Sequence, residues 1–136
     1  MKTFTILKPD TVKAGNAGAI ISRLEKEGFR IRAMKMLHLT ETQAQGFYYV
    51  HKERPFFPSL VKFMSEGPVV LMVLEADNAI DKLRKVMGAT DPGKADAGTI
   101  RKQFGTNIER NAIHGSDGPE TAAFEIGYFF AGIELI

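Results

Sequence analysis

Alternating and helically spaced apolar residues divide the first part of the chain into three elements. Residues Thr3–Leu7 alternate with β-branched or aromatic side chains, which predicts a strand that ends at residues 8–10. Apolar residues recur at helical spacing within Asn16–Glu27, and Gly28 then stands where a helix commonly ends. The stretch Phe29–Leu39 places most of its apolar residues on one face, so it predicts a long second strand.

The middle of the chain combines helical segments with one strongly apolar strand. Thr40 is a typical N-cap residue for a helix that runs into residues 43–53. Arg54-Pro55 breaks that helix, and a further short helix holds the apolar residues at positions 60–64. Pro68–Ala76 is almost continuously apolar, which is typical of a central strand that is covered on at least one face.

The C-terminal part contains two helices separated by a long irregular segment and a short strand. Asp77 or Asn78 caps the first helix, and residues Gly88–Gly105 then lose all periodicity, which predicts a functional loop. Ala112-Ile113 predicts a last short strand and Pro119–Phe130 a last helix. The order of the elements predicts an α/β (α+β) sandwich in which helices pack on a four-stranded sheet.

The composition fits one globular domain, residues 1–136, with a substantial hydrophobic core. Apolar residues make up 44% of the chain, and the net charge of +2 is too small to indicate a nucleic acid or an anionic membrane as partner. The absence of cysteine excludes disulfides, thiolate zinc sites and a cysteine nucleophile. No apolar run is long enough for a signal-peptide core or a membrane span, so we expect a cytoplasmic location.

Residues Gly88–Ala95 come close to the phosphate-binding pattern G-x-x-x-x-G-K-[ST] but do not complete it. Ala95 has no hydroxyl group to bind Mg²⁺, and the segment follows a predicted helix, whereas a P-loop joins a strand to a helix. If this protein handles phosphate, it must therefore use side chains from several parts of the chain.

His114 is the most informative of the three histidines. It follows the predicted strand Ala112-Ile113, which provides a rigid base, and it precedes the small or polar residues 115–118, whose glycines leave room for a large ligand. A loop histidine without a function is the ordinary interpretation of a single residue of this type. His38 lies in a predicted strand and His51 in a predicted helix, so we expect both to be structural or solvated.

The residues after His114 predict the start of a helix. Asp117 and Glu120 have the D-x-x-E spacing of a capping pattern, so Ser116 and Asp117 are expected to cap the helix first and to shape the site second. The imidazole would then lie near the positive end of a helix, where anions bind well. Glu125, about a turn and a half into that helix, could hold one imidazole nitrogen so that the other acts as the nucleophile.

These residues also carry a resemblance to a known family. The stretch NAIHGSD resembles the active-site signature of nucleoside diphosphate kinases, in which the histidine carries the phosphoryl group. Further blocks agree in order and spacing, from Ile6 to Glu125: LKPD at Leu7–Asp10, Tyr48 before RPFF at Arg54–Phe57, MGATDP at Met87–Pro92, and AGTIR at Ala97–Arg101. Each block alone is weak, but their joint order is specific.

The resemblance implies a ferredoxin-like fold with an antiparallel sheet and a ping-pong exchange in which His114 takes the γ-phosphoryl group of ATP and gives it to a nucleoside diphosphate. It implies catalytic roles for Lys8, Tyr48 and Glu125 beside His114. It further implies that Arg84 and Arg101 hold the terminal phosphates, aided by the Thr90 hydroxyl. Lys8 and Asn111 would contact the sugar. The base would be surrounded by Phe56, Leu60 and Ile108. Stacking on Phe56 contacts the flat face of a base, which all bases have, so it implies low base specificity.

The family resemblance also implies a cofactor and an assembly. Mg²⁺ would be held mainly by the nucleotide phosphates, and no cluster of carboxylates in the sequence indicates a dedicated metal site. Family members form homo-oligomers, either tetramers or hexamers, and the sequence does not decide between them. Two departures from the family pattern, Phe47 in place of a common histidine and Gly118 in place of a common serine, lie outside the residues that carry the chemistry.

Two other classes of function compete with this interpretation. A ferredoxin-like module that binds nucleotides without catalysis would need no nucleophile, so the presence of His114 argues against it. A nucleic-acid-binding role would favour a basic stripe among the aromatic residues, and the sequence has none.

Overall fold

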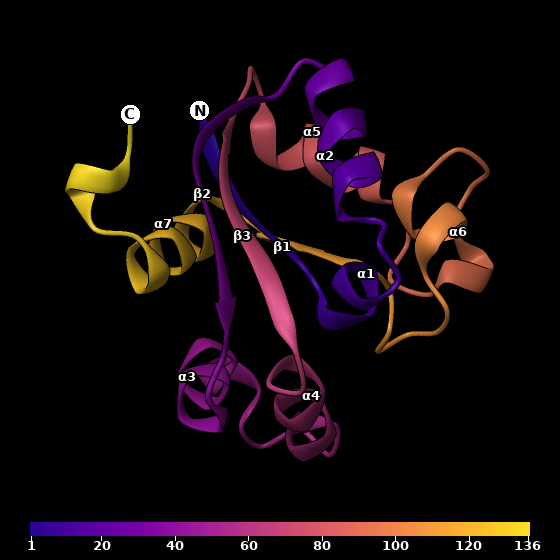
Figure 1. Cartoon of the computed structure of the whole chain (residues 1–136), viewed down its shortest axis with the longest axis vertical. Helices are drawn as coiled ribbons and strands as arrows, with labels where there is room; N and C mark the ends of the chain where they lie inside the picture. The colour runs from indigo at the N-terminus through magenta and orange to yellow at the C-terminus, as the bar shows by residue number, and fades with distance from the viewer.

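The structure, a computed structural model of all 136 residues, is built on a four-stranded antiparallel sheet (Figure 1). The strands are β1 (Lys2–Leu7), β2 (Arg30–His38), β3 (Pro68–Glu75) and β4 (Ile113–Gly115), in the spatial order β2-β3-β1-β4. All three pairings are antiparallel. The predicted four-stranded α/β sandwich is therefore confirmed.

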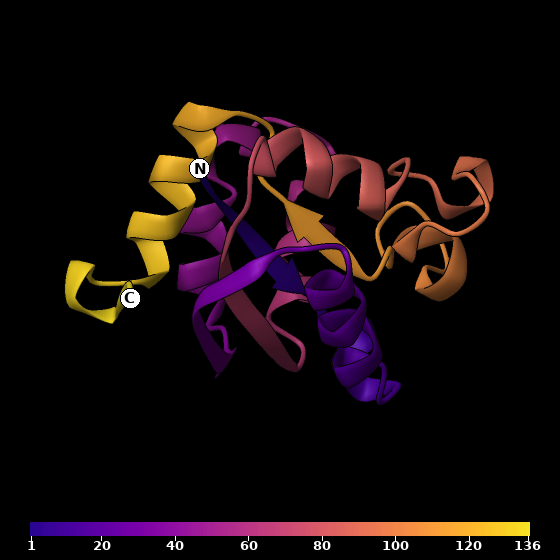
Figure 2. The same cartoon turned by 90° about the horizontal axis from the view of Figure 1, so that it is seen from above.

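Helices cover both faces of this sheet (Figure 2). On one face α2 (Ala17–Lys26) and α5 (Ala79–Met87) contribute to the hydrophobic core, and on the other face α3 (Glu41–Phe47) and α4 (Phe57–Met64) do so. Helix α7 (Pro119–Phe129) also packs on this second face, since partly buried apolar residues of α7 join its core cluster. The shorter elements are α1 (Pro9–Lys13), α6 (Ile100–Phe104), and the 3₁₀ turns η1 (Tyr49–His51), η2 (Pro92–Lys94) and η3 (Gly132–Glu134).

Strand β3 explains why the sheet is buried on both faces. Its residues alternate between two core clusters, since side chains of successive strand residues point to opposite faces. Val70, Met72 and Leu74 belong to the cluster under α2 and α5, whereas Val69, Leu71 and Val73 belong to the cluster under α3 and α4. The nearly continuous apolar run that identified this strand is the consequence of burial on both sides.

Two short helices depart from the predicted elements. Helix α6 lies inside residues Gly88–Gly105, which were expected to form a loop, and it begins with the Thr99 hydroxyl accepting a hydrogen bond from the Lys102 N–H. Helix α1 begins with Pro9 at its first turn, directly after β1. Each spans five residues, which is too short for an apolar period to be visible.

Two predicted boundaries were also wrong. The helix that follows the capping box at Thr40 ends at Phe47, because Gly46 is a poor helix former and the chain tightens into η1. The last strand is Ile113–Gly115, so His114 lies within the strand, opposite Ile6 of β1, and not beyond its end. Ala112, which was expected to start the strand, instead has a φ of 75° and forms a turn.

Candidate active site

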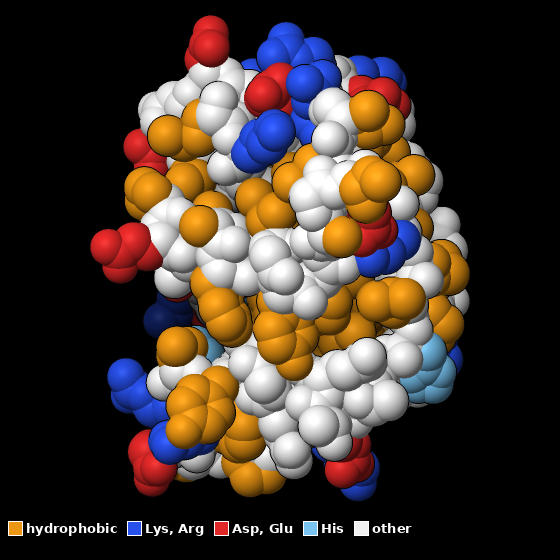
Figure 3. Space-filling model, turned by 90° about the vertical axis from the view of Figure 1, so that its left-hand side faces the viewer, with side chains coloured by type: hydrophobic (Ala, Val, Ile, Leu, Met, Phe, Trp, Pro, Cys, Tyr) orange, Lys and Arg blue, Asp and Glu red, His pale blue; other side chains and the backbone are white.

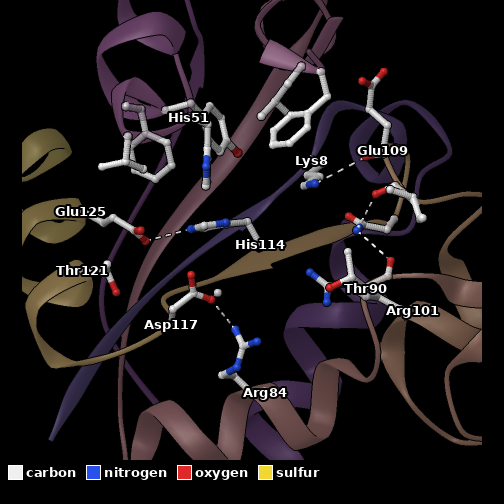
Figure 4. Close-up of a pocket in the computed structure, with 18 residues that line it drawn as sticks. Lys8, His51, Arg84, Thr90, Arg101, Glu109, His114, Asp117, Thr121 and Glu125 are labelled. Carbon is white, nitrogen blue, oxygen red and sulfur yellow. Dashed lines mark hydrogen bonds and ion pairs between the residues drawn. The ribbon is translucent and has the colours of Figure 1, made fainter. Parts of the chain in front are cut away.

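A cavity of about 420 Å³ opens beside β4 and is lined by residues from both halves of the chain (Figure 4). Its size is that of a site for a small organic ligand. Every residue that the sequence suggested for the site lies around it: Lys8, Tyr48, Phe56, Leu60, Arg84, Thr90, Arg101, Ile108, Asn111, His114 and Glu125. The fold thus brings together side chains that are more than a hundred positions apart, while the role of each one remains a prediction.

His114 projects from the middle of β4 toward α7, as Figure 4 shows. Its Nε2 lies 2.8 Å from Oε1 of Glu125, and the Ser116 hydroxyl donates to the same carboxylate oxygen at 2.8 Å. A carboxylate only accepts hydrogen bonds, so the Nε2–H of His114 donates, and in the neutral ring the lone pair is then on the other nitrogen, Nδ1. The sequence-based expectation that Glu125 reaches back to the imidazole agrees with this contact.

Aromatic rings enclose the imidazole on one side. The ring centroids of Phe47, Tyr48 and Phe4 lie 5.4, 6.1 and 6.4 Å from that of His114, each in an edge-to-face arrangement. Phe4, Phe47 and Tyr48 are all buried. These contacts restrict the imidazole to one orientation and keep water from that side of the ring.

Three cationic side chains face the same cavity. Lys8, at the end of β1, is buried, and burial together with the nearby charge of Arg101 lowers the pKa of Lys8 to about 8. The Arg101 guanidinium donates to the backbone oxygens of Ile113 at 2.8 Å and Gly88 at 3.1 Å. Burial, followed by the charge of Arg84, lowers the pKa of Arg101 to about 10, so Arg101 stays charged at neutral pH.

Arg84, from α5, is held by an acidic partner. Its Nη1 lies 2.7 Å from Oδ1 of Asp117, and both side chains are exposed. After burial, the charge of Arg101 is the second cause of the lowered pKa of Lys8, and the charge of Arg84 is the second cause of the lowered pKa of Arg101. An anion in the cavity would relieve this repulsion between the cations.

Several buried polar atoms of the site have no hydrogen-bond partner within the protein. They are the Tyr48 hydroxyl, Nε of Arg101 and Oδ1 of Asn111. Burial raises the pKa of the Tyr48 hydroxyl, and the charge of Glu125 raises it further, so Tyr48 stays protonated. Unpaired buried polar groups are costly, which indicates that the cavity binds a polar ligand.

Some residues around the cavity have places that differ from those expected from the sequence. His51, which was expected to be structural or solvated, lines the cavity, and its place three positions after Tyr48 on a helical turn was the available signal. Asp117 pairs with Arg84 and does not cap α7. The N–H of Gly118 instead donates to the Thr121 hydroxyl, because Gly118 occupies the N-cap position. Ser116 donates to Glu125 and so belongs to the histidine's surroundings.

The site offers cations for phosphate but few ligands for a metal. No group of three or more His, Asp or Glu side chains is placed to hold a metal ion. Oε1 of Glu125 already accepts from His114 and Ser116, and Oδ1 of Asp117 pairs with Arg84. This donor set fits a divalent cation only if phosphate oxygens of a ligand supply most of its coordination.

The family of this chain follows from comparison with known proteins. A family model described as nucleoside diphosphate kinase matches residues 1–135. The chain belongs to the nucleoside diphosphate kinase family. The nucleoside diphosphate kinase of Syntrophotalea carbinolica is 62% identical over 99% of this chain and 98% of its own length, and that of Geobacter sulfurreducens is 58% identical over the same shares.

Solved structures agree with this assignment. The nucleoside diphosphate kinase of Aquifex aeolicus superposes with a TM-score of 0.97 at 48% identity, covering 99% of this chain and 98% of its own. The Halobacterium salinarum enzyme, solved in complex with CDP, superposes with a TM-score of 0.96 at 40% identity, covering 100% of this chain and 91% of its own. The ferredoxin-like α/β fold expected from the resemblance is therefore confirmed.

Nucleoside diphosphate kinases transfer the terminal phosphoryl group from a nucleoside triphosphate to a nucleoside diphosphate in two half-reactions through a phosphohistidine, and this chain has that activity. The family needs a divalent cation for catalysis. No helix in the structure has both the length and the apolar character that a membrane crossing requires.

Proposed function

We propose that Nδ1 of His114 is the atom that carries the phosphoryl group. The observation that supports this most directly is the 2.8 Å contact between Nε2 and Glu125, because it leaves the Nδ1 lone pair free. In the first half-reaction this lone pair forms a bond to the γ-phosphorus of a nucleoside triphosphate, and the bond to the β–γ bridging oxygen breaks, releasing the diphosphate. In the second, a terminal oxygen of another diphosphate attacks the phosphorus and the N–P bond breaks.

Glu125 has two tasks in this scheme. It orients the ring before the reaction, and its negative charge stabilises the imidazolium that forms when Nδ1 is phosphorylated. The Ser116 hydroxyl, which donates to the same oxygen, holds the carboxylate in place. Tyr48, whose hydroxyl is buried without a partner, supplies a proton donor beside the phosphohistidine.

The cationic residues bind and stabilise the transferring group. Phosphoryl transfer demands mostly positioning and charge stabilisation, and guanidinium groups match phosphate oxygens in geometry. Arg101 is already held by two backbone oxygens, whereas Arg84 exchanges its Asp117 partner for phosphate when the nucleotide binds. Lys8 and Thr90 complete the contacts around the terminal phosphates.

The remaining cavity residues bind the nucleoside. Asn111 is placed for the sugar, with its Oδ1 buried and unpaired while its Nδ2 donates to the backbone oxygens of Thr90 and Ile108. Phe56 is 48% exposed at the mouth and offers a ring face for stacking, with Leu60 and Ile108 on the other sides. Stacking and apolar contact do not distinguish the hydrogen-bonding edges of bases, so purine and pyrimidine nucleotides are both accepted.

Mg²⁺ is the divalent cation that we propose for this enzyme, bound mainly by the nucleotide's own phosphates. When bound, it neutralises phosphate charge and orients the phosphate chain. Lys8, Arg84 and Arg101 then compensate the charge that the ion leaves unmatched.

The decisive experiment is a phosphorylation assay with Mg-ATP labelled in the γ-phosphate. We expect an acid-labile, alkali-stable phosphoprotein that passes its label to added diphosphates of both purine and pyrimidine bases. His114→Ala should abolish the label, whereas His38→Ala, a control on β2 whose imidazole forms a hydrogen bond with the backbone oxygen of Ser65 outside the cavity, should retain it. Retention of the label in His114→Ala would exclude the proposed carrier.

We further propose that residues 1–136 act as one catalytic domain within a cytoplasmic homo-oligomer. Strand β2 is at the edge of the sheet, with Met34 and Met36 exposed on it. Figure 3 shows this side of the molecule, on which hydrophobic side chains gather between the charged groups near its two ends. An open edge strand with exposed apolar residues favours pairing with a second copy. Met36→Lys should lower the mass measured by analytical ultracentrifugation, and an unchanged mass would exclude this edge as the interface.

A further inference from the structure

An aspartate outside the lining of the cavity holds the backbone from which two of the cavity's polar side chains project. Asp10 lies in the first turn of α1, directly after β1. Its Oδ2 accepts a hydrogen bond from the backbone N–H of Ala112 at 3.1 Å, across 102 positions of sequence. None of the roles proposed above uses Asp10.

Ala112 adopts a conformation that alanine rarely takes. Its φ is 75°, in the left-handed region, and only one other residue that is not glycine has a positive φ. The N–H of Ile113 donates to the backbone oxygen of Asn111 at 2.9 Å, which closes a three-residue turn around Ala112. A γ-turn with a positive central φ is the strained form of this turn, so the surrounding structure must hold it in place.

The segment from Lys8 to Thr11 binds both backbone polar groups of Ala112. The N–H of Ala112 donates to the carboxylate of Asp10. The carbonyl oxygen of Ala112 accepts from the Thr11 hydroxyl and from the backbone N–H of Lys8, each at 2.9 Å. Fixing the peptide groups on both sides of a residue fixes its φ and ψ. Asp10 is therefore the residue that binds the N–H of Ala112, whereas two groups bind its carbonyl oxygen.

The strained turn lies between two residues of the site. Asn111 precedes Ala112, and His114 follows two positions later on β4. If φ of Ala112 relaxed to the usual negative range, the peptide before it would rotate and Asn111 would move relative to His114. A displacement of this kind matters because phosphoryl transfer depends on the geometry of the groups around the phosphorus.

We propose that Asp10 is a positioning residue for catalysis: by holding the strained turn at Ala112, it sets the placement of Asn111 relative to the nucleophile His114. Asp10 acts through the backbone and does not contact the nucleotide. This inference rests on the proposed role of His114. Two simpler roles for Asp10 compete with this proposal. Asp10 would stabilise the first turn of α1 in one, and it would act as a counter-charge for Lys8 in the other.

A rescue experiment separates these roles. Asp10→Ala should lower kcat by about tenfold, the usual order of effect for losing a hydrogen bond to a charged acceptor, while the KM for nucleotides changes little. Adding Ala112→Gly should restore most of the lost kcat, because glycine adopts a positive φ without strain. A helix-stabilising or counter-charge role of Asp10 would not respond to a glycine at position 112.

The structure provides a matched control for the rescue. Asn78 is the other residue apart from glycine with a positive φ, 51°, and it lies at the start of α5. Asn78→Gly places a glycine at another positive-φ position that has no contact with Asp10, so it should not restore the kcat of Asp10→Ala. A rescue by Asn78→Gly equal to that by Ala112→Gly would mean a general gain of stability and would overturn the proposal.

Asp10→Asn tests whether the hydrogen bond or the charge matters. Its amide oxygen can still accept from the Ala112 N–H, so this variant should keep most of the kcat. A loss as large as that of Asp10→Ala would assign the effect to the charge beside Lys8 and overturn the proposal. Full kcat in Asp10→Ala, or no rescue by Ala112→Gly, would overturn it as well.

A second variant covers the case in which Asp10→Ala does not fold. Thr11→Val removes the hydroxyl bond to the Ala112 oxygen while keeping the side-chain volume, and it should lower kcat by about two- to threefold, restored by Ala112→Gly. An unchanged kcat, or a loss without rescue, would contradict the proposal. Failure of the His114 assignment is a separate outcome, since it would appear as label retained in His114→Ala whatever the Asp10 variants do.

Discussion

The two ends of the cavity are built in different ways. At the phosphate end Lys8 and Arg101 are 6% and 7% exposed, and Asn111, which we propose for the sugar beside them, is 2% exposed. Hydrogen bonds to main-chain oxygens join the segments of Lys8 and Arg101 to residues 112 and 113. At the base end Phe56 and Ile108 are 48% and 62% exposed. Apart from the exposed Arg84 and Thr90, the first end lies against the sheet and the core, whereas the second is formed by α4 and the loop before β4.

Side-chain contacts join the two walls of the base end. The Arg110 guanidinium forms two bonds to the carboxylate of Glu66, at 2.9 and 3.2 Å, and lies 4.6 Å from the centroid of the Phe63 ring. The Ser59 hydroxyl donates to Glu109 at 2.8 Å. These contacts join α4 to the loop that carries Ile108, so they set the width of the opening. They are exposed, and exposed pairs contribute little free energy.

The difference matches the demands of the reaction. Transfer of the phosphoryl group requires fixed geometry around phosphorus, which buried and multiply bonded groups supply. A cavity that accepts several bases needs an opening that can adjust to purines and pyrimidines. The base end allows this because its two walls, α4 and the loop that carries Ile108, are exposed and only weakly joined. Changes at the phosphate end should therefore affect kcat or nucleotide binding strongly, and those at the base end should change KM weakly.

The largest effect is expected where the nucleophile is oriented. Glu125→Ala removes the partner of Nε2, so the ring loses its orientation and its stabilising charge, and kcat should fall about a hundredfold. Steady-state kinetics would measure this, with Glu120→Ala, an exposed glutamate on the same helix, as control. Equal kcat values for the two variants would remove the main distinction between the two ends.

A smaller effect is expected from pH, through Lys8. Burial lowers the pKa of Lys8 to about 8, so the ammonium group is mostly charged at pH 7 and mostly neutral above pH 9. Because the charged form binds phosphate, the KM for nucleotides should rise by about fivefold between pH 7 and 9. Lys8→Arg keeps its charge over this range, so its KM should stay level. A wild-type KM that does not change with pH would show that Lys8 does not titrate there.

The smallest effect is expected at the mouth. Glu66→Gln weakens the pair with Arg110, so the two walls separate more easily and the KM for nucleotides should rise by about two- to threefold without a change in kcat. High salt should reduce the difference from wild type, because it screens exposed charges. Glu27→Gln, which breaks the exposed Arg23–Glu27 pair on α2, is the matched control. A fall in kcat as large as that of Glu125→Ala would contradict the proposed division of the cavity.

Much of the fold was predictable because local patterns carry it. The alternation in β1 and the apolar run of β3 identified both central strands, and the apolar spacing in α2 and α5 identified the helices that cover one face. The helices α1 and α6 were missed because five residues give no period. The capping role expected for Asp117 was wrong because Arg84, distant in sequence, provides a stronger partner at 2.7 Å.

The sequence by itself determined the alternation of strands and helices, the apolar faces that form the core, and the residue types that suit phosphoryl transfer. Those properties follow from spacing along the chain, which sets the direction of each side chain in a helix or strand. Only the tertiary structure decided that His114 lies within β4, opposite Ile6 of β1, and that Asp10 holds a strained turn at Ala112. Contacts between residues a hundred positions apart depend on how the elements pack, and no local pattern encodes them.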